Sequence, residues 1–513
     1  MSGGRPEPAG IIMAPNLLHR AGQAVALNAV ANWTTMVGSF LSIVIIARIL
    51  TPEDYGVFVM ALLAVSLPEV IASGTLGDAL VQRRDLRQGH INSVFLQSML
   101  LSIGLWLALI MFAPLIAKGF SDPAVVPVLV VCGALLPIGA LMSVPAALLQ
   151  RDLRYREITV VDIMGTVAAA LVGIVLAVLW RNEWALVGME MSRRLVRLVG
   201  FLYFAKWVPR VTSSWPDFRE LARFNATNGT SKLLQTIDGM LPKTLIGVTL
   251  GSHSVGVFNL PERLFAQAHS ALIAPFAAVA MPVASAMQDN RETLHRAMES
   301  AIRMSALLAY PTFVGGFVIA PFAIPIVFGE QWAPSVPIFQ IYMIVGLRAP
   351  ITAIILGVFR GVGRPDVVVW ITLTSIVATV ILLACTYRYG LTAIALGLLG
   401  KQVITFVLST WMTQKVVGFS VVRQMVAGSS AFFASAIMGV VVWLFMDYVP
   451  DGSHEMLHVV ATVVLGALVY PAALFCMMPR LGRQILQAVS ILFAGQPREA
   501  LRTVRGAILE QNA

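Results

Sequence analysis

The chain has 513 residues, of which 58% are hydrophobic and only 12% are charged, and its formal net charge is +10. Soluble domains carry about twice that fraction of charged residues, so a soluble globular protein is excluded. The mean hydropathy of +0.81 indicates apolar sequence throughout the chain. The positive charges lie mostly in short loops, as in membrane proteins, and no nucleic acid partner is expected.

The apolar segments are long and lack the alternation of barrel strands. Backbone polar groups in lipid must be satisfied within the segment, so these runs are predicted to be helices. We predict an all-α integral membrane protein with about 14 transmembrane helices. A cytoplasmic segment at 1–21 precedes them. No signal peptide is predicted, because the apolar stretch that follows is longer than a signal h-region.

The first six predicted helices form an N-terminal bundle at 22–206. They lie at 22–49, 55–81, 91–117, 125–149, 157–180 and 184–206. A basic cytoplasmic linker at 207–223 leads to a second six-helix bundle at 224–414. Its helices lie at 224–249, 254–286, 297–328, 333–358, 366–387 and 391–414. Two additional transmembrane helices (424–447 and 456–478) occupy 415–478, and a cytoplasmic amphipathic tail is predicted at 479–513.

Basic residues concentrate in alternate loops. One set of loops holds most of them, including Arg84, Arg154 and Arg364. The other set holds only Arg48, Lys118, Arg181 and Arg388. Loops rich in Lys and Arg stay in the cytoplasm, so both termini are predicted to be cytoplasmic in a multi-pass membrane protein.

The chain also contains a repeat. LTPEDYGVF begins at Leu50 and LGSHSVGVF begins at Leu250, so Leu, Gly, Val and Phe recur 200 residues apart. Two six-helix units have the same orientation in the membrane, which predicts a pseudo-two-fold axis along the membrane normal. Two facing bundles are typical of a transporter that works by alternating access.

Several stretches resemble the Wzx-type polysaccharide flippases. They are LTPEDYGVFVMALLA, LGDALVQRRDL, LLQRDLRYRE and DGMLPKTLIGVTLGSHSVGVFNLPERL. The likeness is greatest to the exopolysaccharide subgroup, within the superfamily that includes MATE exporters and the lipid II flippase. The resemblance implies a flippase for undecaprenyl-pyrophosphate-linked oligosaccharide repeat units in exopolysaccharide, capsule or O-antigen biosynthesis. It also implies membrane lipid, a polysaccharide polymerase and export proteins as partners. The chain departs from the family at Gly247-Val248, where a basic residue is common.

Some basic residues fall inside predicted helices, where each costs roughly 2.5–3.5 kcal/mol or more if it faces lipid. Arg193 and Arg194 have Glu190 within one turn, Arg303 has Glu299 one turn away, and Lys243 is close enough to a helix end to reach the interface. The remaining cations have no acid on the same helix face and are the substrate-binding candidates: Lys232, Arg263, Arg348 and Lys401. Arg197 is a weaker fifth candidate. We expect the four to line one cavity that receives a pyrophosphate, although each could also be structural.

Acidic residues inside predicted helices are candidates for ion coupling. They are Glu69, Asp162 and Asp238, and the coupling ion would be H+ or Na+. Asp238 resembles a family acid at this place, but the alternative that it is the partner of a lysine is slightly favoured. The three cysteines have no motif spacing. No metal, cofactor or catalytic residue is expected.

Three other functions fit the sequence less well. A polysaccharide polymerase or ligase would need a sizeable periplasmic loop, and every predicted one is short. An ATP-driven exporter would need a Walker A sequence, which the chain lacks. A MATE-like drug antiporter is the closest alternative, but such proteins favour acidic interiors, whereas basic residues dominate here.

Overall fold

The computed structural model describes residues 36, 38–73, 77, 80–81, 87–210, 215–448 and 455–477. The predicted N-terminal segment at 1–21 and the amphipathic tail at 479–513 lie outside these residues. So do parts of the first helix and of the linker.

The N-terminal half contributes a short apolar helix, Gly38–Ile49, and six labelled helices. These are α2 (Pro52–Ala72), α4 (Gln88–Phe120), α5 (Val125–Gly133), α6 (Leu135–Arg151), α7 (Tyr155–Trp180) and α8 (Trp184–Ala205). Thr51 caps α2 through a capping box with Asp54, which satisfies free N–H groups of the first turn.

The C-terminal half is also helical. Its elements are α9 (Trp215–Leu272), α10 (Ala274–Ala286), α11 (Arg291–Phe328), η1 (Glu330–Ser335), α12 (Val336–Gly346), α13 (Ala349–Gly361), α14 (Pro365–Thr386), η2 (Tyr387–Tyr389), α15 (Leu391–Val417), α16 (Val421–Val426), α17 (Ser429–Tyr448) and α18 (Glu455–Met477). The described residues contain no strand, so the all-α membrane fold is confirmed.

The number of spanning helices among the described residues is smaller than predicted. Nine helices are long and apolar enough to cross a membrane, or up to eleven if each of two bent pairs is one span. The predicted helices at 224–249 and 254–286 meet at Gly251, where φ is 79° and the backbone leaves the helical region. The number of 14 transmembrane helices therefore stays a prediction.

Two predicted spans are broken rather than straight. The chain bends by 51° between α9 and α10 and by 52° between α12 and α13. Pro275 and Pro350 stand in the first turns after these breaks. Proline cannot donate to the preceding turn and its ring clashes with it, so each helix ends and a new one begins inside the span.

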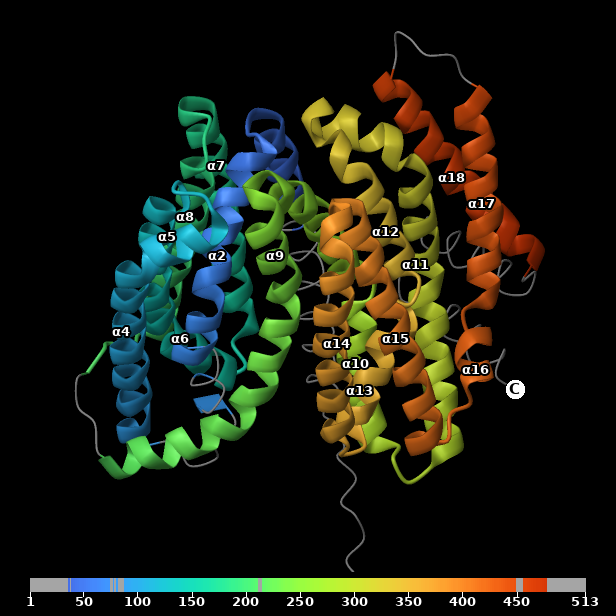
Figure 1. Ribbon diagram of the computed structural model, residues 1–513. Helices are drawn as coiled ribbons and strands as arrows, with labels where there is room; N and C mark the ends of the chain where they lie inside the picture. Colours follow the sequence, from blue (N-terminus) through green and yellow to red (C-terminus); the bar gives the residue numbers. More distant parts are fainter. Residues whose placement is uncertain are drawn as a thin grey trace, which may run out of the picture.

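The helices form two lobes (Figure 1). One lobe holds α2 and α4–α8, the other holds α10–α16, and α9 runs between them. Helices α17 and α18 lie at the outer edge of the second lobe. The lobes match the predicted two bundles with two additional helices, while the residue boundaries of the domains stay a prediction.

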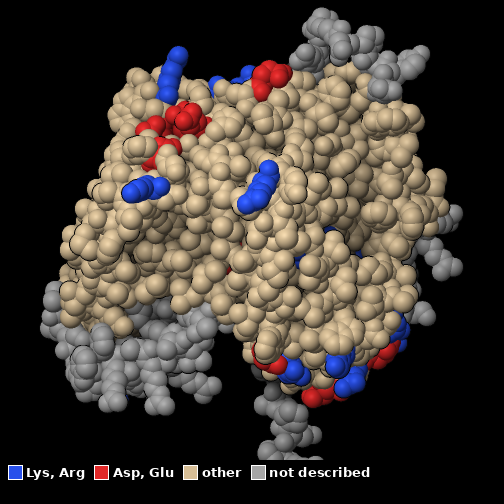
Figure 2. Space-filling model, viewed as in Figure 1, with Lys and Arg blue, Asp and Glu red and all other residues tan. Residues whose placement is uncertain are grey.

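Charged and apolar side chains separate on the surface. Leu107, Met111 and Leu115 follow one face of α4 and are 59%, 69% and 65% exposed, as expected of a face in contact with lipid. Figure 2 shows Lys and Arg gathered at the lower end of the second lobe. This basic end carries the exposed residues Arg291, Arg296, Arg360, Arg364, Lys415 and Arg423.

Candidate anion-binding site

A network of charges inside the first lobe joins α8 to α2. The Glu190 carboxylate, buried on α8, pairs with Arg193 and lies 3.0 Å from Arg194 Nε. The other side of the Arg194 guanidinium contacts Glu69 on α2, with 2.5 Å between Nη1 and Oε1. The pairing of Glu190 with both arginines, predicted from their spacing of three and four residues, is confirmed.

Arg197 lies one turn further along α8. Its Nε is 2.9 Å from Asp162 Oδ1 on α7, and its guanidinium also lies over the Phe201 ring. Two of the three acids considered for ion coupling, Glu69 and Asp162, therefore have arginine partners.

The third acid, Asp238, lies in the second lobe. Its Oδ1 is 3.0 Å from Lys401 Nζ on α15 and accepts a hydrogen bond of 2.8 Å from Ser375 Oγ on α14. The Lys401 side chain is only 8% exposed. Asp238 is thus the partner of a lysine, the alternative favoured from sequence.

Lys243 is paired as well. Its Nζ is 3.1 Å from Glu262 Oε2, a partner that the sequence did not indicate. The two residues flank the turn at Gly251 at similar distances along α9. Because the chain reverses at this turn, residues at similar distances on either side of it lie at the same depth in the membrane, where they can pair.

Two of the candidate cations, Arg348 and Arg263, have no carboxylate of the described residues within salt-bridge distance. Arg348, between α12 and α13, donates a hydrogen bond to Gln402 Oε1, while its buried Nε has no hydrogen-bond partner. Arg263, on α9, lies within electrostatic range of Arg193 and Glu190 of the first lobe. The charges of the surrounding pairs cancel, so these two guanidinium groups leave the interior positively charged.

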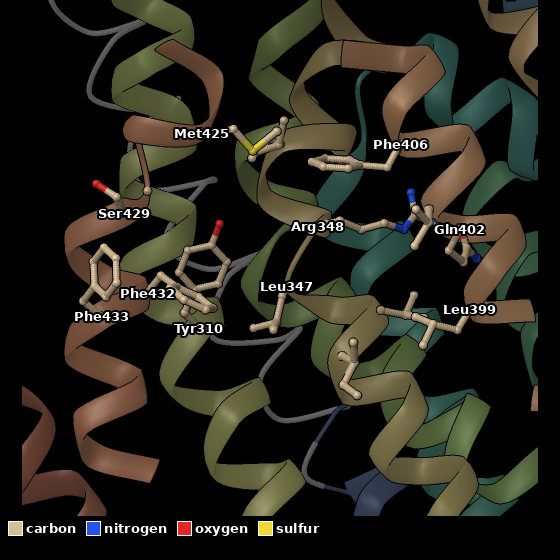
Figure 3. Close-up of a pocket in the computed structure, with 15 residues that line it drawn as sticks. Tyr310, Leu347, Arg348, Leu399, Gln402, Phe406, Met425, Ser429, Phe432 and Phe433 are labelled. Carbon is tan, nitrogen blue, oxygen red and sulfur yellow. Dashed lines mark hydrogen bonds between the residues drawn. The ribbon is translucent and has the colours of Figure 1, made fainter. Parts of the chain in front are cut away.

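Arg348 lines an apolar cavity of about 430 Å³ (Figure 3). Tyr310, Phe406, Phe432 and Phe433 form much of its wall. In the figure the Arg348 side chain extends across the cavity toward Gln402. The cavity therefore has one cationic end and a mainly aromatic and aliphatic remainder.

A second cavity, of about 390 Å³, adjoins the first. Its charged and polar lining includes Asp238, Glu262, His269 and Lys401. The wall residues Val345, Leu399 and Gln402 line both cavities, so Gln402 stands between Arg348 and the Lys401–Asp238 pair.

The four candidate cations occupy different places. Arg348 and Lys401 line adjoining cavities, whereas Arg263 lines neither and faces the first lobe. Lys232 is exposed on α9. Sequence reasoning missed Gln402, although a polar residue next to Lys401 inside an apolar segment is a signal of the same kind.

Residues 45–337 match the family described as polysaccharide biosynthesis protein. The chain belongs to this family. The succinoglycan biosynthesis transport protein ExoT of Rhizobium meliloti is 24% identical over 466 residues, which covers 90% of this chain and 93% of that protein. The lipopolysaccharide biosynthesis protein WzxC of Escherichia coli is 22% identical over 389 residues, covering 74% and 78%.

Solved structures give the same fold. The lipid II flippase MurJ in an inward closed conformation superposes with a TM-score of 0.74 at 13% identity, covering 89% of this chain and 99% of that one. An inward-facing MATE transporter reaches 0.61 at 17% identity, covering 76% and 98%. The resemblance to the polysaccharide flippases is confirmed. The protein is a multi-pass membrane protein of polysaccharide biosynthesis with the fold of this transporter superfamily.

Proposed function

We propose that the protein is a flippase that moves undecaprenyl-pyrophosphate-linked oligosaccharide repeat units across a bacterial inner membrane by alternating access. The observation that carries this proposal is the pair of arginines without a described carboxylate within salt-bridge distance, Arg263 and Arg348, in an interior where Arg193, Arg194, Arg197, Lys243 and Lys401 are paired with carboxylates. A buried cation without an anion is costly, and an anionic substrate would supply the missing partner.

The surroundings of Arg348 fit an amphiphile. Attraction between unit charges grows severalfold as the effective dielectric constant falls from about 80 toward about 20, so a few cations can replace the water that a pyrophosphate loses. The aromatic wall beside Arg348 offers apolar surface to the lipid part of the same molecule.

A MATE-like antiporter for cationic drugs fits this interior less well. Glu69, Asp162, Asp238 and Glu262 each have a basic partner among the described residues, so none offers a free carboxylate to a cation. Coupling to H+ or Na+ through Glu69, Asp162 or Asp238 would require that an ion pair open. This coupling and the partnership with polymerase and export proteins stay predictions.

The proposal is tested by depleting the protein in a strain that makes the polysaccharide. Surface polysaccharide should fall while the lipid-linked repeat unit accumulates in the inner membrane, as measured by mass spectrometry of extracted lipids. The accumulated oligosaccharide should resist enzymes added from the periplasmic side. If depletion leaves both pools unchanged, the protein moves something else.

We also propose that the basic end faces the cytoplasm, since exposed Lys and Arg are retained on that side. In a variant whose native cysteines are replaced, single cysteines at Arg154 and Arg364 should resist a membrane-impermeant thiol reagent added to intact cells. A cysteine at His253, beside the turn at Gly251, should react. Labelling at Arg364 from outside would reverse the orientation.

A further inference from the structure

The two copies of the repeated loop motif meet each other. Gly56 lies in the first turns of α2, and Gly256 lies just after the turn at Gly251 in α9. A Cβ atom added to Gly56 would be 1.8 Å from the carbonyl oxygen of Ser252. One added to Gly256 would be 1.7 Å from the carbonyl oxygen of Pro52. Both glycines therefore hold backbone against backbone, where no other residue fits without movement.

The Gly56–Ser252 contact and the Gly256–Pro52 contact are equivalent by the symmetry of the repeat. Pro52 and Ser252 occupy equivalent places in the repeat, 200 residues apart, and so do Gly56 and Gly256. When residue i of one copy meets residue j of the other, and j meets i in return, a two-fold axis passes between them. The axis predicted from the repeat therefore runs between the starts of these two helices. We call the mutual contact of Gly56 with Ser252 and of Gly256 with Pro52 the glycine dyad.

Other contacts between the halves gather at the same end. Gln331 Nε2 donates to the carbonyl oxygen of Ala47 at 2.7 Å, and Trp332 Nε1 donates to the same oxygen at 2.8 Å. Arg48 Nε donates to the carbonyl oxygen of Val327 at 2.8 Å. Each of these bonds joins the end of the first helix to the segment around η1.

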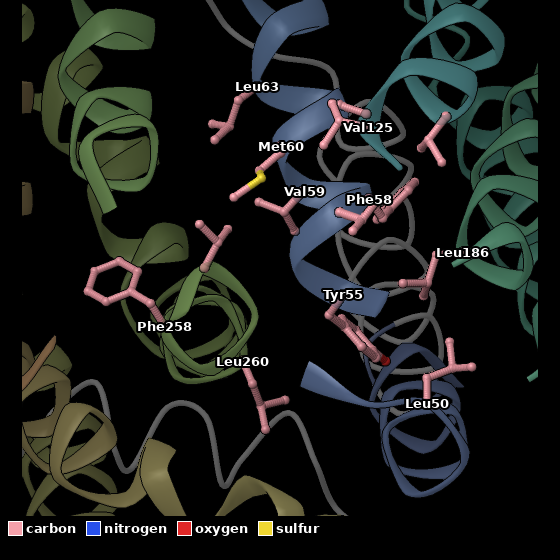
Figure 4. Packing of buried hydrophobic residues seen from close by; sticks show 14 of the residues in the cluster. Leu50, Tyr55, Phe58, Val59, Met60, Leu63, Val125, Leu186, Phe258 and Leu260 are labelled. Carbon is pink, nitrogen blue, oxygen red and sulfur yellow. The ribbon is translucent and has the colours of Figure 1, made fainter. Parts of the chain in front are cut away.

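A shared apolar core surrounds these contacts (Figure 4). Tyr55, Phe58 and Met60 of α2 and Phe258 and Leu260 of α9 belong to it. The other core clusters among the described residues each draw their members from one half of the chain. The halves are thus sealed to each other at the end opposite the basic end.

We propose that the glycine dyad is the closing contact of the gate at this end, and that α2 and the second part of α9 separate there in every transport cycle. This proposal rests on the alternating-access function proposed above. A contact without side chains lets the helices approach closely and then part without unlocking interdigitated groups. Its backbone contacts are individually weak, so the closed state can be left again.

The test uses Gly56→Ala and Gly256→Ala in a background without native cysteines, with a reporter Ser66→Cys. Ser66 lies deeper on α2, where its Oγ is 3.7 Å from Met240 Sδ of α9. An impermeant thiol reagent is added to intact cells or to inside-out vesicles. Labelling from the side of the dyad should rise roughly tenfold or more in both glycine variants, because a Cβ that overlaps the opposing backbone destabilises the closed state and shifts a two-state gate toward its open state. Export should fall in both.

The matched control is Gly104→Ala in α4, because an added Cβ at Gly104 meets no atom within 4 Å. It should change neither labelling nor export. Unchanged labelling in the two dyad variants would overturn the proposal. So would a strong effect of one glycine together with a silent partner, because a two-fold contact makes them equivalent.

A cross-link between the two halves is an independent test of the gate if the alanine variants fail to accumulate in the membrane. Cysteines at Arg48 and Val327 are joined by a short bifunctional methanethiosulfonate reagent, since Arg48 Nε lies 2.8 Å from the Val327 carbonyl oxygen, and the cross-link should stop export until a reductant is added. Undiminished export by the cross-linked protein would show that this end does not open. The Ser66 labelling needs no substrate, so it separates failure of the gate from failure of the proposed substrate.

Discussion

An Arg348→Gln variant should lose nearly all polysaccharide export while remaining in the membrane at the parent level. The physical reason is the absence of a carboxylate partner: removal of this guanidinium leaves no protein anion unpaired, so the fold loses little. The substrate anion does lose its partner. Truncating one member of a buried charge pair costs about 2–5 kcal/mol, which corresponds to a loss of roughly 30-fold or more in affinity.

Arg348→Lys should retain part of the activity, since the positive charge is kept while the planar guanidinium that donates to Gln402 is lost. Arg364→Gln is the control, because Arg364 is exposed at the basic end and pairs with Asp366. Surface polysaccharide would be quantified per amount of protein in the membrane. Normal export by Arg348→Gln, or its loss from the membrane, would make this arginine structural and remove the main support for an anion site.

The second large effect is expected at the Lys401–Asp238 pair. Lys401→Gln leaves the Asp238 carboxylate with Ser375 alone in the interior of the second lobe, and breaking a buried pair costs about 3–5 kcal/mol. The amount of folded protein should therefore fall, and export with it. The double variant Lys401→Gln with Asp238→Asn removes both charges and should restore the protein level.

Export by the double variant decides the role of Lys401. If the lysine only neutralises Asp238, export returns together with the protein. If Lys401 binds the substrate, as predicted from sequence, the protein returns and export does not. Asp238→Asn alone should also lower the protein level, because it leaves Lys401 without its carboxylate.

The helical fold could be predicted from sequence because hydropathy reports burial in lipid residue by residue. The breaks inside two spans could not. Pro275 and Pro350 stand at breaks between helices. Pro145 and Pro311 lie inside continuous helices. Packing against the neighbouring helices determines whether a proline breaks its helix or is accommodated in it.

The candidate site was predictable only where partners are close in sequence. The pairing of Glu190 with Arg193 and Arg194 follows from the period of one helix. The Lys401–Asp238 pair joins α15 to α9 and needs the packing of the second lobe. For the same reason, Lys232, Arg263, Arg348 and Lys401 looked alike in sequence, although they differ in exposure and partners.

The break before α13 has a consequence for hydration. Across this break, backbone hydrogen bonds span three residues instead of four, as in the bond from Leu347 N to the carbonyl oxygen of Ile344. Some carbonyl groups of the helix therefore lose their usual N–H donors. Irregular backbone at membrane depth is tolerated where it is buried in protein or lines a water-filled cavity. We therefore expect water at the Arg348 end of the cavity and none beside Phe432 and Phe433. On this expectation the cavity selects against both a free sugar, which would leave the aromatic wall uncovered, and a plain hydrocarbon, which cannot replace the water around the guanidinium.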